Sequence, residues 1–243
     1  MNNLTDAIKH LIIINVIVFV APQLLQLDFT NMLALHFPMN EHFGIWQYVT
    51  HMFMHGSFAH ILFNMYGLWA FGTPLEQMWG KKKFIFFYFS AGLGAGLIYT
   101  LVNYYQFNSL YELFINAGLN NSEVFSILKS GSTNDARVVG AISQEQFNQI
   151  TSLYNTPAVG ASGAIYGVLV AFGLFFKDAK LALIFFPVPI AAKYFIPVMI
   201  LGDLFFGMTK YSVGNVAHFA HIGGALIGFI IAWYWKKNQF KVN

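Results

Sequence analysis

The chain has 243 residues, of which 57% are hydrophobic and only 9% are charged, with a formal net charge of +3. This composition is typical of an integral membrane protein rather than a soluble domain, so we expect the lipid bilayer as a partner and no nucleic acid. The chain contains no cysteine, which excludes a disulfide framework and a thiolate nucleophile.

Six apolar segments predict six membrane-spanning helices. The first lacks the small-residue cleavage site of a signal peptide and is long enough to span the bilayer. The fifth follows a break at Pro187 and Pro189 and is predicted to enter the membrane at Lys193. The predicted spans are 8–27, 58–79, 84–105, 159–176, 193–208 and 216–235. The expected fold is therefore an all-α, six-helix membrane bundle that forms a single domain over 1–243.

The basic residues predict the orientation of these spans. With a cytoplasmic amino terminus, ten Lys residues fall inside, whereas Lys129, Arg137 and Lys210 fall outside. Cytoplasmic loops carry an excess of Lys and Arg, so both termini are predicted to be cytoplasmic. The absence of cysteine and of a transit peptide favours a bacterial inner membrane.

Two outer segments are unusually long. The segment 28–57 mixes aromatic and polar residues, which is typical of structure lying along the membrane surface. The segment 106–156 is polar and is interpreted as an extramembrane insertion with short helices between spans three and four. The predicted helix caps are Asn121 or Ser122, for a helix ending before Gly131, and Ser143 with Gln146.

The fourth span begins at the motif Gly160-Ala161-Ser162-Gly163. A helix from Ser162 to Lys177 covers 15 residue steps. That is roughly 22 Å, less than the hydrocarbon core of about 30 Å. The helix is therefore predicted to start inside the membrane, where irregular backbone survives only if protein surrounds it or it lines a wet cavity. We interpret Ser162 as a candidate nucleophile, with a tight helix-packing site as the alternative for this motif alone.

The second span carries His60 and Asn64, which are four residues apart and share a helix face. Unpaired polar groups within spans are costly, so each is a functional candidate. Hydrogen bonds that hold neighbouring helices together are the alternative interpretation.

The sixth span carries His221, Gly224 and Gly228 on one face. These glycines and the matching Gly163 and Gly167 of the fourth span predict a close helix–helix contact. His221 precedes Lys236 by 15 residues, the same spacing as that from Ser162 to Lys177. A serine and a histidine are therefore expected at one depth, and Asn64 belongs to the same layer.

A Ser–His pair with neighbouring amide and imidazole donors is suited to acyl transfer. No carboxylate is expected beside His221, because Glu76 lies near the inner end of its span and Asp203 lies high in the fifth. The prediction is thus a catalytic dyad of Ser162 and His221, with His218 nearer the outer rim.

A metal site is the competing chemistry. His51, His55 and His60 lie on the approach to the second span. No HExxH motif is present, and no acidic residue sits beside these histidines. We therefore expect no metal and no cofactor.

Three motifs on three predicted helices resemble those of the rhomboid intramembrane serine proteases. They are Gly160-x-Ser162-Gly163, His55-x4-His60-x3-Asn64 and Ala220-His221-x2-Gly224-x3-Gly228. The resemblance covers roughly Trp46 to Trp235. It implies six spans and the hydrolysis of a peptide bond in transmembrane protein substrates, near the outer end of the substrate's span.

The resemblance also implies roles for individual residues. Ser162 would be the nucleophile and His221 the base, and His60, Asn64 and the Ser162 backbone N–H would bind the oxyanion. Tyr166 resembles the aromatic residue that stacks on the catalytic histidine. Gly72-x3-Glu76 resembles a structural motif at the inner end of the second span.

The chain departs from the family pattern at two places, and two alternative functions remain open. The chain has Trp46-Gln47 where the family often has Trp-Arg, and its 106–156 insertion is long for the basic form. A catalytically inactive rhomboid-like protein that binds membrane clients is the main rival. A transporter would require discontinuous helices in symmetric pairs, and the sequence predicts a single half-helix. No oligomeric state follows from the sequence.

Overall fold

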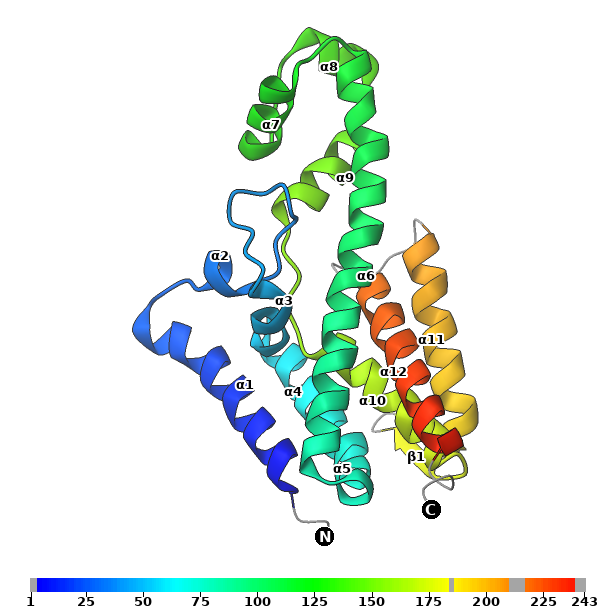
Figure 1. The fold of residues 1–243 in the computed structure, drawn as a ribbon. Coiled ribbons are helices and arrows are strands. Elements are labelled where there is room, and N and C mark those ends of the chain that lie inside the picture. The colour runs from blue at the N-terminus through cyan, green and yellow to red at the C-terminus, as the bar shows by residue number, and fades with distance from the viewer. Residues whose placement is uncertain (1–3, 184–185, 210–216, 239–243) are drawn as a thin grey trace.

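The computed structural model describes residues 4–183, 186–209 and 217–238, and these are mostly α-helical. Figure 1 shows a helical bundle from which the long helix α6 (Lys81–Asn116) projects to reach the small helices at the far end. Helix α1 begins, and helix α12 ends, at the opposite end of the molecule.

The remaining elements divide between the bundle and the segments outside it. The bundle helices are α1 (Asp6–Leu25), α4 (Phe58–Gly67), the π-helix η2 (Leu68–Gly72), α5 (Thr73–Trp79), α10 (Ser162–Phe175), α11 (Ala192–Met208) and α12 (His218–Asn238). The outer segments contain α2 (Thr30–Leu33), α3 (Gln47–Thr50), the 3₁₀ helix η1 (His51–Phe53), α7 (Asn121–Ser130), α8 (Ala136–Ala141) and α9 (Gln144–Asn155). The strands are β1 (Lys180–Leu183) and β2 (Phe186–Ala191).

Helical segments overlap all six predicted spans, although the ends of the first, fourth and sixth differ by one to three residues, and residue 216 lies outside the described residues. By length and composition, α1, α6 and α12 are able to cross a membrane. Helix α10 is apolar but has only 14 residues and begins at Ser162. The second span is divided into α4, η2 and α5, and α11 has 17 residues. The count of six spans therefore stays a prediction, and the all-α membrane class is supported.

The segment before α11, where the sequence predicted a break in the apolar run, forms regular structure. Residues around Pro187 and Pro189 form β2, which pairs with β1 in an antiparallel hairpin. Proline cannot donate to a strand ladder, and in this two-stranded sheet both strands are edges, where proline is tolerated.

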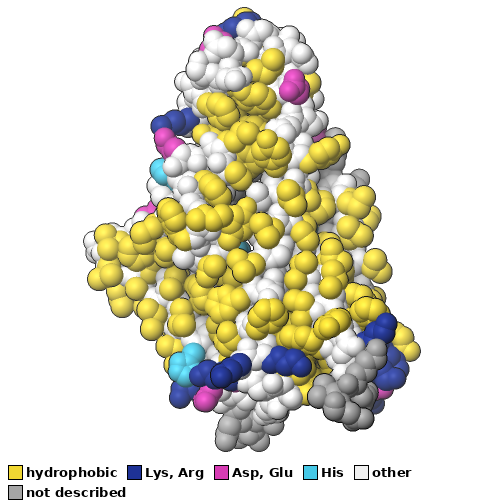
Figure 2. Space-filling model, viewed as in Figure 1, with side chains coloured by type: hydrophobic (Ala, Val, Ile, Leu, Met, Phe, Trp, Pro, Cys, Tyr) yellow, Lys and Arg dark blue, Asp and Glu magenta, His cyan; other side chains and the backbone are white. Residues whose placement is uncertain are grey.

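The surface of the bundle matches a bilayer environment. Figure 2 shows hydrophobic side chains over the visible face of the bundle, with basic side chains gathered at its lower edge. Helix α6 begins with Lys81, Lys82 and Lys83, and α12 ends near Lys236 and Lys237. An apolar belt bounded by basic residues is typical of an integral membrane protein. Lys210 and Lys241 lie outside the described residues.

Helices α10 and α12 pack backbone to backbone, as the glycine spacing predicts. A Cβ placed on Gly224 would lie 1.8 Å from the carbonyl oxygen of Gly163. A Cβ on Gly228 would lie 2.4 Å from the Cα of Gly167. Helix α6 packs against the same contact, because a Cβ on Gly163 would lie 2.5 Å from the Ala95 Cβ. These positions therefore require glycine, because there is no space between the helices for a side chain.

Glu76 of α5 fixes the amino-terminal end of α1. Its carboxylate accepts hydrogen bonds from the backbone N–H groups of Ala7 at 2.8 Å and Ile8 at 3.0 Å, and from the Thr5 hydroxyl. These N–H groups have no partner within the helix, and a negative charge is favourable at a helix amino terminus. Gly72 leaves room for Ile8. The Gly72-x3-Glu76 motif therefore caps the first span.

The outer insertion has its own apolar core. Helix α6 continues to Asn116, so the predicted insertion boundary at Gln106 falls inside a helix. The reason is an apolar stripe on α6 at helical spacing, which packs against α7 and α9. The stripe comprises Phe107, Leu110 and Phe114, all buried.

The predicted helix caps in the insertion are partly confirmed. Ser143 and Gln146 form the predicted capping box of α9. The cap of α7 is Asn120 instead of Asn121 or Ser122, because Glu123 stands three residues after Asn120 and completes a capping box there.

We predict that Gly224→Val lowers the thermal stability of the protein in detergent. The valine side chain has no space against Gly163, and overpacking of this kind costs about 1–3 kcal/mol. Gly202→Val on α11 is the matched control, because no atom lies within 4 Å of a Cβ built there. Melting followed by circular dichroism should show a loss for Gly224→Val alone. Equal melting temperatures for the two variants would contradict the close helix contact.

Candidate active site

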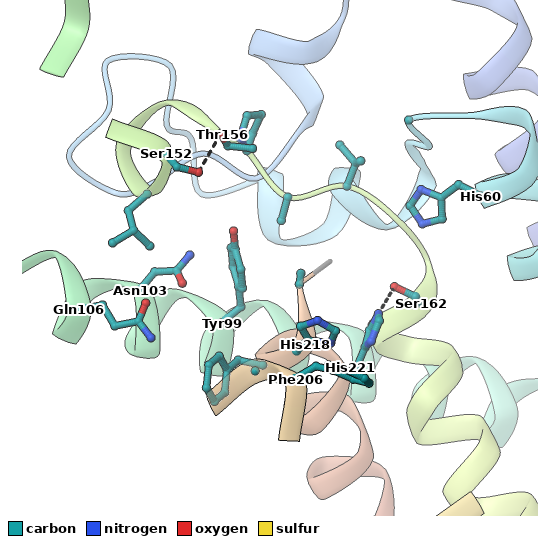
Figure 3. A pocket seen from close by; sticks show the side chains of 18 of the residues that line it. His60, Tyr99, Asn103, Gln106, Ser152, Thr156, Ser162, Phe206, His218 and His221 are labelled. Atoms are coloured by element: carbon teal, nitrogen blue, oxygen red, sulfur yellow. Dashed lines mark hydrogen bonds between the residues drawn. The ribbon is translucent and has the colours of Figure 1, made fainter. Parts of the chain in front are cut away.

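A cavity of about 900 Å³ lies between α6, α11, α12 and the segment that leads into α10. Ser162, His221 and His60 border it at one end, and Asn103 and Gln106 of α6 border it at the other (Figure 3). The three residues at the first end are the predicted nucleophile, the predicted base and a predicted oxyanion donor.

Ser162 and His221 are in hydrogen-bond contact. The distance between Ser162 Oγ and His221 Nε2 is 2.9 Å, and both side chains are partly buried. Ser162 is the first residue of α10, and His221 lies one turn into α12. The contact exists because Gly163 and Gly224 let these two helices approach closely. The predicted common depth of the serine and the histidine is confirmed.

Hydrogen bonds to the first outer segment hold the backbone before Ser162. The N–H groups of Leu35 and Ala158 each donate to the carbonyl of the other at 2.9 Å, and the Gly160 N–H donates to the His51 carbonyl at 2.9 Å. Gly160 has φ +125°, a conformation that L side chains rarely adopt, and a Cβ there would lie 2.8 Å from His60 Nε2. The glycine therefore allows both the turn and the approach of His60.

Gln47 anchors the first outer segment in place of the arginine frequent in the family. Its side chain is fully buried. The amide nitrogen donates to the carbonyls of Asn31 at 3.0 Å and His42 at 2.8 Å, and the amide oxygen accepts from the His36 N–H at 3.1 Å. A neutral amide thus satisfies three backbone groups without placing a charge in the interior.

The Tyr166 ring stacks on the His221 ring. The ring centroids are 4.2 Å apart and the planes differ by 9°. Tyr166 follows Ser162 by one helical turn, as the resemblance implied. The phenol hydroxyl also donates a hydrogen bond to Asp203. Stacking and hydrogen bond together restrict the orientation of the imidazole.

The expectation that no carboxylate lies beside His221 is wrong. Asp203 Oδ1 is 3.2 Å from His221 Nδ1, on the side of the ring opposite Ser162. Asp203 stands near the carboxyl-terminal end of α11, and His221 stands near the amino-terminal end of α12, so both residues reach the same level. The signal in the sequence was a lone acidic residue within an apolar helix, which is rarely present without a role.

His218 is the first residue of α12, one turn before His221, and it also borders the cavity. Its Nδ1 is 2.6 Å from Asp203 Oδ1, a contact that the sequence did not predict. His218 and His221 are three residues apart and share a helix face, a spacing visible in the sequence. Asp203 is consequently hydrogen-bonded by Tyr166, His218 and His221.

Among the described residues, Asp203, His218 and His221 could offer ligand atoms to a metal ion, since these atoms lie within 4.8 Å of one another. The group differs from the His51, His55 and His60 set considered from the sequence. In the structure the same atoms hydrogen-bond to each other.

His60 and Asn64 lie on α4 as predicted. His60 borders the cavity, and its ring packs edge-on against His55 with centroids 5.0 Å apart. Asn64 is buried, and its amide nitrogen has no hydrogen-bond partner within the described part of the chain. A buried donor without a partner is costly and is often found at functional sites.

Comparison with known proteins gives a consistent result. The family model described as "Rhomboid domain" matches residues 42–119 and 123–238. The chain is 29% identical to Rhomboid protein 1, mitochondrial, of Saccharomyces cerevisiae, over 76% of this chain and 40% of that protein. It is 26% identical to Rhomboid protease AarA of Providencia stuartii, over 77% of this chain and 54% of that protein. A shorter match, 40% identical over 72 residues, is to Rhomboid protease GlpG of Salmonella typhi.

The relatives bear on length and location. The chain spans about 40% of the yeast protein and 54% of AarA. Several relatives are mitochondrial by name, including Presenilin-associated rhomboid-like protein of rat and RHOMBOID-like protein 12 of Arabidopsis thaliana. The expectation of a bacterial inner membrane is therefore not supported, whereas an integral membrane location is. From the family model and from the motifs that border the cavity, this chain is a member of the rhomboid family.

Proposed function

We propose that this chain is a serine endopeptidase that cuts a peptide bond in or near the transmembrane segment of a protein substrate. The 2.9 Å contact between Ser162 Oγ and His221 Nε2 at the wall of a cavity carries this proposal. A nucleophile and its base need a separation of about 2.6–3.2 Å. The names of AarA and GlpG as rhomboid proteases support the same reaction class.

The proposed chemistry follows from this contact. His221 Nε2 takes the hydroxyl proton as Ser162 Oγ attacks the carbonyl carbon of the substrate. His221 then gives that proton to the nitrogen of the leaving amine, and the C–N bond breaks to leave an acyl-enzyme. Water activated by the same imidazole attacks the ester, and Ser162 recovers its proton. The open cavity beside Ser162 provides the route for water.

The oxyanion would be bound by His60, Asn64 and the backbone N–H of Ser162. The Ser162 N–H lies in the first turn of α10, where N–H groups lack helical partners and the helix dipole favours negative charge. Donors fixed before the reaction stabilise charge as it develops, with little reorganisation.

Asp203 would act as the residue that positions His221. Its carboxylate accepts from the Nδ1–H tautomer of His221, which leaves the Nε2 lone pair directed at the Ser162 hydroxyl. Tyr166 holds the carboxylate from one side and His218 from another. The working unit proposed here is therefore Ser162, His221 and Asp203, in place of the predicted dyad.

A catalytically inactive binder of membrane clients remains the alternative function. Such a protein has no need of a serine hydroxyl in contact with an imidazole, or of a carboxylate behind that imidazole. The described geometry therefore favours the enzyme. The basic lower edge would face the cytoplasm, which places the cavity towards the outer side of the membrane.

We predict that Ser162→Ala and His221→Ala each abolish cleavage of a single-span model substrate, with the double variant little worse than either. Ser162→Ala should also lose labelling by a fluorophosphonate in detergent. Ser109→Ala, at an exposed position on α6, is the control and should keep both activities. Substantial cleavage by Ser162→Ala would exclude the serine-protease mechanism.

Removal of the Asn64 amide should lower kcat and leave KM nearly unchanged, because the charge it binds develops only in the transition state. Loss of one oxyanion donor costs on the order of 10²–10³ in kcat in soluble serine proteases. We expect a smaller loss for Asn64→Ala, since His60 and the Ser162 N–H remain. An effect confined to KM would instead assign Asn64 to substrate binding or packing.

Asp203→Asn keeps the shape of the side chain and removes its charge. We expect kcat to fall by on the order of 10⁴-fold, while KM stays near the wild-type value, because the imidazole loses its preferred tautomer. The rate of fluorophosphonate labelling should fall in parallel. If kcat is retained, Asp203 has only a packing role.

A further inference from the structure

Three side chains beside Ser162 form a cluster with the donor set of a transition-metal site. His221 Nδ1 and His218 Nδ1 lie 3.2 Å and 2.6 Å from the same oxygen of Asp203, and the ligand atoms of the three residues lie within 4.8 Å of one another. Two imidazole nitrogens and one carboxylate oxygen are the ligands that Zn²⁺ uses in sites with one open position. The cluster therefore has the chemistry to bind such an ion.

The separations of these atoms are close to those that a zinc ion requires. Bonds of about 2.0–2.1 Å in a tetrahedron place neighbouring ligand atoms about 3.3 Å apart. The distance between His221 Nδ1 and Asp203 Oδ1 is 3.2 Å, and no pair of ligand atoms is more than 4.8 Å apart. The widest pair therefore has to close by at most about 1.5 Å, which small rotations of the side chains supply.

The neighbours of the cluster orient it in the way that an outer shell orients metal ligands. Tyr166 donates to Asp203 Oδ2, which leaves Oδ1 directed at the two imidazoles. The Tyr166 ring also stacks on His221 and fixes the plane of its ring. Metal-bound histidines almost always donate their other ring N–H to an oxygen acceptor. His221 Nε2 faces such an acceptor, Ser162 Oγ, at 2.9 Å.

The cluster can be reached from the cavity. His218 and His221 both border the cavity of about 900 Å³, and Figure 3 shows them next to each other beside Ser162. Their side chains are not fully buried. An ion that enters the cavity thus meets the two imidazoles, and a water molecule can take its fourth coordination position.

Metal binding and catalysis need opposite tautomers of His221. In the proposed reaction the ring proton sits on Nδ1, facing Asp203, and the Nε2 lone pair accepts the Ser162 proton. A metal bound at Nδ1 uses the lone pair of that nitrogen, so the one proton of the neutral ring is carried by Nε2. Nε2 then donates to Ser162 Oγ and no longer accepts its proton. The same ion also occupies the carboxylate oxygen that orients the imidazole.

We propose that Asp203, His218 and His221 form an inhibitory site for Zn²⁺ or for a divalent transition metal with the same ligand preference. The ion enters from the cavity, binds the two Nδ1 atoms and Asp203 Oδ1, and holds His221 in the tautomer that cannot act as a base. It is a reversible inhibitor and not a cofactor of the reaction. The inhibitory effect rests on the proposed protease function, whereas the binding of the metal does not.

Metal binding is tested on the wild-type protein in detergent, after treatment with a chelator and removal of that chelator. Co²⁺ is the probe, because it occupies zinc sites and its visible absorption distinguishes tetrahedral coordination from that of the hydrated ion. One equivalent should bind with a tetrahedral spectrum, and Zn²⁺ should displace it. Mg²⁺ should not, since it prefers six oxygen ligands. Absence of the tetrahedral bands would overturn the site.

Inhibition is measured on the same preparation. Zn²⁺ should slow both the cleavage of a single-span model substrate and the fluorophosphonate labelling of Ser162, over the concentration range in which it displaces Co²⁺. EDTA should restore both rates, and Mg²⁺ should leave them unchanged. Unaltered rates at zinc concentrations that displace Co²⁺ would overturn the inhibitory role.

His218→Ala removes one ligand and leaves Ser162 and His221 in place. Each variant is compared with its own rate without metal. The zinc concentration for half-inhibition should rise by at least on the order of 100-fold, because loss of an outer-shell partner alone costs about 10–100-fold in affinity. The tetrahedral Co²⁺ spectrum should also disappear. His42→Ala is the matched control, because His42 is exposed and does not line the cavity. It should keep both wild-type responses, and equal behaviour of the two variants would overturn the site.

Should His218→Ala not fold, Asp203→Asn replaces it and is judged by the Co²⁺ spectrum alone. A spectrum like that of the wild type would then overturn the proposal. Failure of the protease function has a different signature, since cleavage and labelling that depend on Ser162 are absent while the wild-type Co²⁺ spectrum remains. Loss of the spectrum with intact cleavage overturns the metal site alone.

Discussion

The structure depends on one close approach, between the backbones of α10 and α12. A Cβ on Gly224 would lie only 1.8 Å from the Gly163 carbonyl oxygen, so no other residue fits without moving a helix. Without a hydrophobic driving force between helices in lipid, contacts of this kind supply the packing energy of a membrane bundle. The same contact sets the Ser162–His221 distance. Stability and site geometry therefore rest on the same pair of glycines.

The second constraint is the burial of polar groups within an apolar bundle. Asp203 is buried, and it is satisfied by Tyr166, His218 and His221 from two other helices. The Asp203 carboxylate is tolerated in this position because the three neighbouring ring side chains donate hydrogen bonds to its oxygens. The network ties α11 to α10 and α12, although α11 has many exposed apolar side chains. It also leaves the imidazole of His221 with one orientation.

The outer segments form a support above the bundle. Gln47 holds the first outer segment through three backbone groups, and the Leu35–Ala158 pair connects that segment to the backbone leading to Ser162. Phe37 enters the core of the insertion, and Lys129 pairs with Glu41 at 2.7 Å. The insertion and the first outer segment therefore hold each other in place beside the cavity.

The sequence by itself determined the membrane class, the positions of the helical segments and the shared level of Ser162 and His221. These follow from local hydropathy, glycine spacing and the fixed rise of a helix, which need no knowledge of neighbours. Tertiary structure alone decided which side chains meet across helices. Helix rotation and tilt brought Asp203 to His221, although counting along the chain had placed it elsewhere. The continuation of α6 past Gln106 likewise depended on a core formed with α7 and α9, although the helical spacing of Phe107, Leu110 and Phe114 was a signal for it in the sequence.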